Sequence, residues 1–159
     1  MMLSPLKLHK YFFTRINIEA SQKPCCDIGK ISTKITCGHK DDDERQWLVT
    51  LKVILDKSED EKTIPPYTGE LEILGFFTID SKYPADNVHK LVHFNAPAML
   101  YGAVREMVFN LTARGPNPHI NLPTVSFLDN TPKKGNESKE NNVSLPKTGK
   151  PSRKQVKRK

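Results

Sequence analysis

The stretch FNAPAMLYGAVREMVFNLTARGPNPHINLPTVSFL, residues 94–128, decides the fold of this chain. Asn95 is a residue type that caps helices, and Pro97 suits a first helical turn, where its missing N–H costs no hydrogen bond. Gly115, followed by a proline, is a common end of a helix. The pattern therefore predicts a helix over about residues 96–114.

The predicted helix has an apolar face and a polar face. The apolar face carries Leu100, Val104, Met107, Val108 and Leu111, with Tyr101 at its edge. Glu106, Asn110 and Arg114 share the polar face. Phe109 belongs to neither face, which indicates that the helix also meets a second surface, such as a partner subunit.

The segment after the helix contains three prolines between residues 115 and 126 and should run extended, because proline cannot donate to a regular ladder. It also carries apolar side chains, namely Ile120, Leu122, Val125 and the following Phe127. We therefore expect this segment to lie on an apolar surface.

Four segments before the helix alternate with the period of two that is typical of half-buried strands. They cover about residues 10–20, 28–36, 46–56 and 67–79. A slip in the alternation near Gly29 predicts a β-bulge. The connections are short, which favours antiparallel pairing. The predicted fold class is α+β, a two-layer unit with a four-stranded antiparallel sheet packed against one long helix.

The charge is concentrated at one end of the chain. Residues 129–159 contain ten Lys and Arg against three Asp and Glu, which accounts for the whole formal net charge of +7. This segment has few large apolar residues, so the sequence predicts a folded domain over 1–128 and a disordered basic tail over 129–159.

No pattern in the sequence indicates an enzyme, a cofactor or a metal site. The nucleophile elbow, the phosphate-binding loop and the dinucleotide fingerprint are all absent. His89 and His93 have a spacing that suits a metal, but the intervening residues lack a metalloprotease glutamate, so a structural role is expected. Cys25, Cys26 and Cys37 form no disulfide pattern, which favours a reducing compartment.

The order of residues in the helix and after it resembles the SecB family of protein-export chaperones. The helix has the form Tyr101-x3-Arg105-Glu106-x7-Ala113-Arg114-Gly115. It is followed by Pro118-x-Ile120-Asn121-Leu122-x2-Val125-x-Phe127. Upstream, residues 69–77 resemble the last strand of the family and residues 15–20 resemble its first strand.

The resemblance implies an ATP-independent holding chaperone that binds unfolded client proteins without a cofactor. The cysteine pattern and the absence of an apolar run of 18 residues predict a cytoplasmic protein without membrane insertion. Members of the family are homotetramers built as pairs of dimers. The resemblance therefore implies a dimer or tetramer here, with Glu106, Phe109, Asn110 and Arg114 as the candidate interface. Glu19 and Glu70 match positions that dock the SecA export motor, whereas Arg15 stands where export members have an acid.

The aromatic residues give a candidate client-binding groove. Phe12 and Phe13 are adjacent, as are Phe76 and Phe77, so one of each pair should face away from the helix. The groove is predicted to comprise Phe12, Phe13, Trp47, Phe76, Phe77, Phe94 and Phe127. Burial of apolar segments there contributes ~25 cal/mol per Å² and tolerates many client sequences.

Other functions remain open at this point. The basic tail is suited to counterion-release binding of nucleic acid, which would make this a nucleic-acid-associated protein. A SecB-like chaperone that serves a toxin–antitoxin pair is another alternative, and an assembly scaffold without client affinity is a third. Deleting residues 129–159 separates the chaperone from the nucleic-acid binder, because only the latter depends on the tail.

Overall fold

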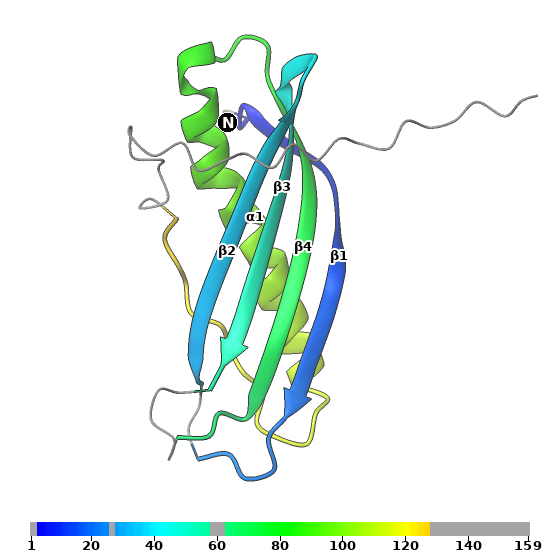
Figure 1. The fold of residues 1–159 in the computed structure, drawn as a ribbon, viewed down its shortest axis with the longest axis vertical. Helices are drawn as coiled ribbons and strands as arrows, with labels where there is room; N and C mark the ends of the chain where they lie inside the picture. Colours follow the sequence, from blue (N-terminus) through cyan, green and yellow to red (C-terminus); the bar gives the residue numbers. More distant parts are fainter. Residues whose placement is uncertain (1–2, 26–27, 58–62, 128–159) are drawn as a thin grey trace, which may run out of the picture.

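The computed structural model describes residues 3–25, 28–57 and 63–127, and the predicted tail lies outside these ranges. Figure 1 shows a curved antiparallel sheet with one long helix behind it. The elements are β1 (Leu6–Ala20), β2 (Lys30–Lys40), β3 (Asp43–Asp56), β4 (Tyr67–Ile79), a 3-10 turn η1 (Ala85–Asn87) and α1 (Val88–Thr112). This arrangement confirms the predicted two-layer α+β fold.

The strand order in the sheet is β1-β4-β3-β2, with antiparallel pairing throughout, so β1 and β2 are the two edge strands. In an antiparallel pair, residues directly opposite each other project to the same face. Leu71 and Ile73 are fully buried against the helix, which assigns their partners Ile16 and Phe13 on β1 to the helix side. The residues between them project to the open face.

The register shifts lie in other places than the sequence predicted. Two occur in β1, between Leu8 and Lys10 and between Phe13 and Arg15. The bulge expected near Gly29 was wrong, because β2 begins only after that residue. A side chain at Gly29 would collide with the backbone carbonyl of Asp56, so the close approach of two chain segments explains the glycine there.

The helix begins earlier than the predicted residue 96. Its N-cap is Asn87, and Pro97 lies inside the helix rather than in its first turn. Asn95 was wrongly assigned as the cap, since its side-chain amide donates to the Leu91 carbonyl oxygen at 2.9 Å. The helix continues upstream because burial of Val88, Val92 and Ala96 stabilises the extra turns, outweighing the hydrogen bond that proline cannot make.

The buried face of the helix also differs at its C-terminal end. Leu111 was expected in the core but is 39% exposed, whereas Thr112 is 1% exposed. The Thr112 hydroxyl donates to the Val108 carbonyl oxygen at 2.8 Å and accepts from the Ile120 N–H at 3.1 Å. The helix crosses the sheet at an angle, so the residues that point at the core change along its length.

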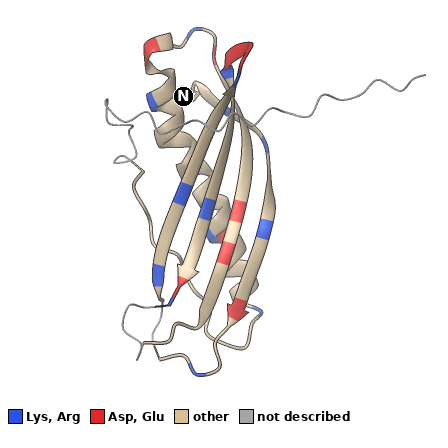
Figure 2. Cartoon of the chain, viewed as in Figure 1, with Lys and Arg blue, Asp and Glu red and all other residues tan. Residues whose placement is uncertain are grey.

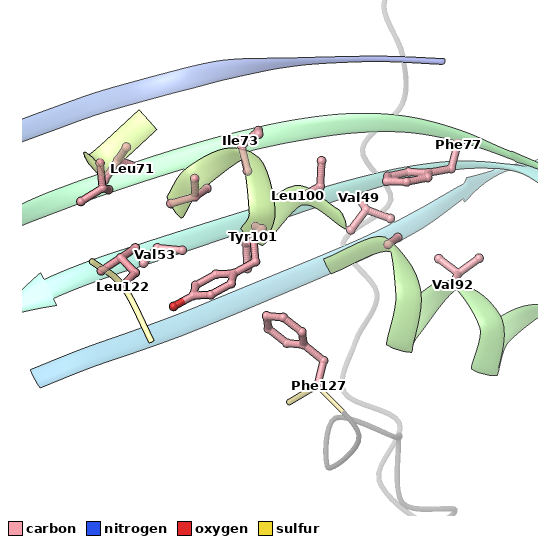
Figure 3. Packing of buried hydrophobic residues seen from close by; sticks show 14 of the residues in the cluster. Val49, Val53, Leu71, Ile73, Phe77, Val92, Leu100, Tyr101, Leu122 and Phe127 are labelled. Carbon is pink, nitrogen blue, oxygen red and sulfur yellow. The ribbon is translucent and has the colours of Figure 1, made fainter. Parts of the chain in front are cut away.

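The extended segment after the helix completes the core. We call residues 117–127 the strap; Figure 1 shows this part of the chain in yellow, on the side of the domain where β2 lies. Ile120, Leu122 and Phe127 are at most 5% exposed and belong to the same core cluster as Leu100. Figure 3 shows Phe127 next to Tyr101, and their ring centroids are 5.9 Å apart. The expectation of an apolar resting surface for this segment is confirmed.

A polar cluster fixes the beginning of the strap. The Asn117 side-chain amide donates to the carbonyl oxygens of Ser21 at 2.8 Å and Pro66 at 2.7 Å. The Tyr67 hydroxyl donates to the Asn117 carbonyl oxygen at 2.8 Å. These bonds join the strap to the β1–β2 connection and to the start of β4. The strap is not paired as a β-strand, so such hydrogen bonds are needed to fix its position.

Candidate functional site

The seven aromatic residues predicted to form one groove do not lie on one surface. Trp47, Phe77 and Phe127 are at most 5% exposed and belong to the hydrophobic core. The Trp47 indole N–H donates to the Glu44 carbonyl oxygen at 2.8 Å, so even its polar group is satisfied internally. A client therefore cannot contact these three side chains in the folded domain. The remaining candidates for the client-binding surface are Phe12, Phe13, Phe76 and Phe94.

Phe12 and Phe76 form the centre of an apolar area on the open face of the sheet. Their ring centroids are 6.0 Å apart, and Phe12 is 45% exposed. Leu48 pairs with Phe76, and Leu74 pairs with Phe12, so all four side chains project to the same face. We call Phe12, Leu48, Leu74 and Phe76 the sheet-face patch. The Lys10 ammonium group lies 4.7 Å from the centroid of the Phe76 ring.

Phe13 lies on the opposite face of β1 from Phe12, as predicted for adjacent strand residues. It is half-buried against the core, while Tyr11 and Ile16 beside it on the helix side are 48% and 47% exposed. Phe94 is half-buried on α1. The edge strand β1 therefore carries apolar side chains exposed on both of its faces.

A charged cluster follows the sheet-face patch along β1, β3 and β4. Figure 2 shows positively and negatively charged positions side by side across the sheet. Glu70 on β4 accepts from Arg15 on β1 and forms an ion pair with Lys52 on β3, whose ammonium lies 2.5 Å from the carboxylate. The hydrogen bonds from Arg15 and Lys52 hold the pKa of Glu70 below its usual range. Glu19, the second predicted docking acid, is exposed at the end of β1.

We expect Glu70→Gln to lower the melting temperature slightly at pH 7 and not at acid pH. A carboxylate whose pKa falls on folding stabilises the folded state above its unfolded pKa, about 4.3, and this contribution is lost as the pH falls through the lower folded value. Arg15 is 62% exposed, so solvent screening keeps the effect small. Thermal melts between pH 3 and 7 measure it, with the exposed Glu44→Gln as control. A difference from wild type that grows below pH 4 would contradict the pairing.

Three residues of the predicted oligomer interface lie on α1, and the fourth, Arg114, follows its C-terminal end. Glu106, Phe109, Asn110 and Arg114 are all exposed in the single chain, Phe109 by 40%. The Phe109 ring packs against the His119 ring from the strap, with centroids 5.0 Å apart. These four side chains are thus not part of the hydrophobic core.

His89, His93 and Cys37 pack against other side chains of the domain. His89 and His93 lie beside Trp47, with ring centroids 5.0 and 6.4 Å from the indole, and among the described residues no group of three or more metal-ligating side chains is placed to hold an ion. Cys37 lies opposite Val49 on the helix side of β2, and burial raises the pKa of its thiol from 9.0 to about 11. Cys25 is exposed.

A protein with Cys37 as its only thiol, Cys25→Ser/Cys26→Ser, should react slowly with a thiol reagent. At pH 8 a pKa of about 11 leaves about 100-fold less thiolate than a pKa of 9.0. We expect labelling about 100-fold slower than in guanidinium chloride, measured with a chromogenic disulfide. The matched variant that retains only the exposed Cys25 should show no such difference, and rapid native labelling of Cys37 would contradict its burial.

Sequence reasoning missed two members of the sheet-face patch and two donors on the helix. Leu48 and Leu74 were not assigned to the site, although Leu74 has the same strand parity as Phe76. Tyr101 and Arg105 donate to the strap: the Tyr101 hydroxyl to the Pro123 carbonyl oxygen at 2.9 Å and the Arg105 Nε to that of Leu122 at 3.0 Å. No sequence pattern indicates these two bonds, because they join segments in an irregular region.

Comparisons with known proteins agree on one family. Residues 8–130 match the model of the SecB family, described as preprotein translocase subunit SecB. The chain is 28% identical over 85 residues to a protein-export protein SecB from Dinoroseobacter shibae, a match that covers 54% of this chain and 49% of the relative. The chain thus spans about half the length of that curated relative.

A solved structure shares the fold. It is the SecB-like chaperone of Mycobacterium tuberculosis in complex with a ChAD peptide from the HigA1 antitoxin. The superposition has a TM-score of 0.60 at 16% sequence identity and covers 77% of this chain and 91% of that one. In the part of the chain that the structure describes, no helix combines the length and hydropathy needed to cross a bilayer.

Proposed function

The chain belongs to the SecB family, and from this premise we propose that it is an ATP-independent holding chaperone for non-native polypeptides. The observation that supports the proposal most directly is the sheet-face patch, an apolar area on the open face with Phe12 45% exposed. A second apolar area, around Tyr11 and Ile16, lies on the other face of the same edge strand. Such surface on a small domain is typical of a protein that binds other chains.

Holding an unfolded client requires no catalysed reaction. An unfolded client exposes apolar side chains in no fixed order, and burial against a flat apolar patch contributes about 25 cal/mol per Å² regardless of that order. β1 is an edge strand, so its outer backbone groups can also pair with an extended client segment. Together these two modes give affinity with little sequence specificity.

Mixing the protein with a chemically unfolded client tests the proposal. We expect stoichiometric amounts of the full-length protein to suppress aggregation, followed by light scattering as denaturant is diluted. Adding ATP should change nothing. Unchanged aggregation at a several-fold excess of the protein would overturn the proposed function.

We further propose that this chaperone serves a dedicated client rather than the export motor SecA. Docking through Glu70 would require a free carboxylate, but Arg15 and Lys52 both engage it within the chain. The structural neighbour bound to an antitoxin peptide supports a dedicated client of that kind. Binding of purified SecA, measured by interferometry, should be much weaker than to an export SecB. Equal affinity would count against this choice.

The proposal includes self-association through the exposed helix face. Glu106, Asn110 and Arg114 supply polar contacts around the apolar Phe109, an arrangement that fits a two-fold interface. Mass by light scattering should therefore show a dimer or tetramer. The free thiol of Cys37 supports a reducing compartment, and we place the chaperone in the cytoplasm.

A further inference from the structure

The strap is bound to its own domain in the way an extended client would be. Residues 118–127 have no regular secondary structure, yet Ile120, Leu122 and Phe127 are almost fully buried, and Val125 packs partly against the same core. The intervening Asn121, Pro123, Thr124 and Ser126 are exposed. This alternation is that of an extended peptide lying in an apolar bed.

The two hydrogen bonds from α1 to the strap are made to its main chain. The hydroxyl of Tyr101 and the guanidinium of Arg105 both donate to main-chain carbonyl oxygens, those of Pro123 and Leu122. Every polypeptide has such carbonyls at the same spacing. The bed on α1 therefore recognises an extended backbone with apolar side chains, whichever chain supplies it.

The strap is anchored at its first residue by side-chain hydrogen bonds and is held along the rest by apolar burial and main-chain hydrogen bonds. Asn117 makes the hydrogen bonds to Ser21, Pro66 and Tyr67 that anchor its beginning. Beyond it, prolines at 118 and 123 remove backbone donors and prevent pairing as a regular strand. Detachment that begins at Phe127 would break apolar contacts and the hydrogen bonds to the carbonyl oxygens of Pro123 and Leu122. An extended apolar client segment can form equivalent contacts.

We propose that the strap is an intramolecular substitute for client, and that clients bind by displacing residues 118–127 from the bed on α1. This inference rests on the proposed function. It defines the preferred ligand as an extended, uncharged segment with apolar side chains at alternating positions, because the strap between residues 116 and 128 carries no Lys, Arg, Asp or Glu. Asn117 acts as the hinge.

A cavity of about 460 Å³ adjoins the anchored end of the bed. It is lined by Pro24, Cys25, Ile28 and Pro66 on one side and by strap residues Pro118 to Asn121 on the other. Because strap residues form part of its lining, displacement of the strap would open this cavity to a client side chain.

Hydrogen exchange on the full-length protein tests displacement directly. The probe is a permanently unfolded, reduced and carboxymethylated protein. We expect the Ile120 amide, whose N–H donates to the Thr112 hydroxyl, to exchange at least about tenfold faster when the probe is bound. Amides of β3 should not change. Unchanged or slower exchange of the strap with the probe bound would overturn the inference and leave the proposed function intact, whereas a probe that does not bind would overturn both.

A pair of variants gives an independent readout. Leu122→Ala removes a 1% exposed side chain from the strap and should raise the population of the displaced state, so that the probe binds at least about tenfold more tightly. The exposed Thr124→Ala in the same segment should bind like wild type. Equal affinity of a folded Leu122→Ala protein, or weaker binding, would contradict displacement. The exchange experiment remains decisive if this variant does not fold.

Discussion

Replacing Phe77 with alanine is expected to lower the free energy of unfolding by about 3–5 kcal/mol. Phe77 is 1% exposed, and its ring fills the space above Gly75, where an added Cβ would lie 2.8 Å from both Phe77 and Leu100. The loss combines the transfer of a large apolar side chain with the cavity it leaves. It is a large share of the 5–15 kcal/mol that stabilises a typical domain.

Phe76→Ala is the matched control, because Phe76 is the adjacent residue on the other face of β4 and is partly exposed. We expect this variant to lose about 1 kcal/mol. Urea unfolding followed by the fluorescence of Trp47, the single tryptophan, measures both variants. Equal losses would contradict the assignment of the two phenylalanines to opposite faces.

The double variant Phe12→Ser/Phe76→Ser should hold clients at least about tenfold less well while remaining folded. It removes both rings from the centre of the sheet-face patch, and aromatic residues in such positions contribute most of the affinity of an apolar surface. The core is untouched, so far-UV circular dichroism should be unchanged. The measurement is the concentration of protein that halves the aggregation of an unfolded client.

Ile64→Ser is the control for the loss of exposed apolar surface as such. Ile64 is 41% exposed, close to the 45% of Phe12, but it precedes β4 and is not part of the patch. We expect it to hold clients like wild type. If the double variant also behaves like wild type, the sheet-face patch is not the client surface, and the bed under the strap becomes the main candidate.

The sequence predicted what depends on local pattern. Strict alternation from Trp47 to Leu55 predicted the strand, and the structure shows that the five side chains of this parity are at most 4% exposed. β4 was predicted at its observed bounds because prolines precede it and its period is unbroken. The helix, the extended apolar segment after it and the family also followed from residue types at fixed spacing.

The helix start and its last buried residue were mispredicted for a common reason. Capping signals describe an isolated helix, whereas the observed start at Val88 depends on apolar surface that β3 and β4 provide. Thr112 rather than Leu111 is buried because the helix crosses the sheet at an angle. A helical wheel drawn from the sequence gives no information about this crossing angle.

Some features of the candidate site were predictable from local sequence, and others depend on tertiary packing. That Phe12 and Phe13 face opposite ways followed from the sequence, and so did the division between Phe76 and Phe77. Which member of each pair is covered depends on where the helix and strap lie, and that is set by packing between segments far apart in the chain. The sequence by itself determined strands, helix and family, because those are local periodicities. Only the tertiary structure decided that Trp47 and Phe127 belong to the core, that Arg15 and Lys52 neutralise Glu70, and that the strap fills its own apolar bed.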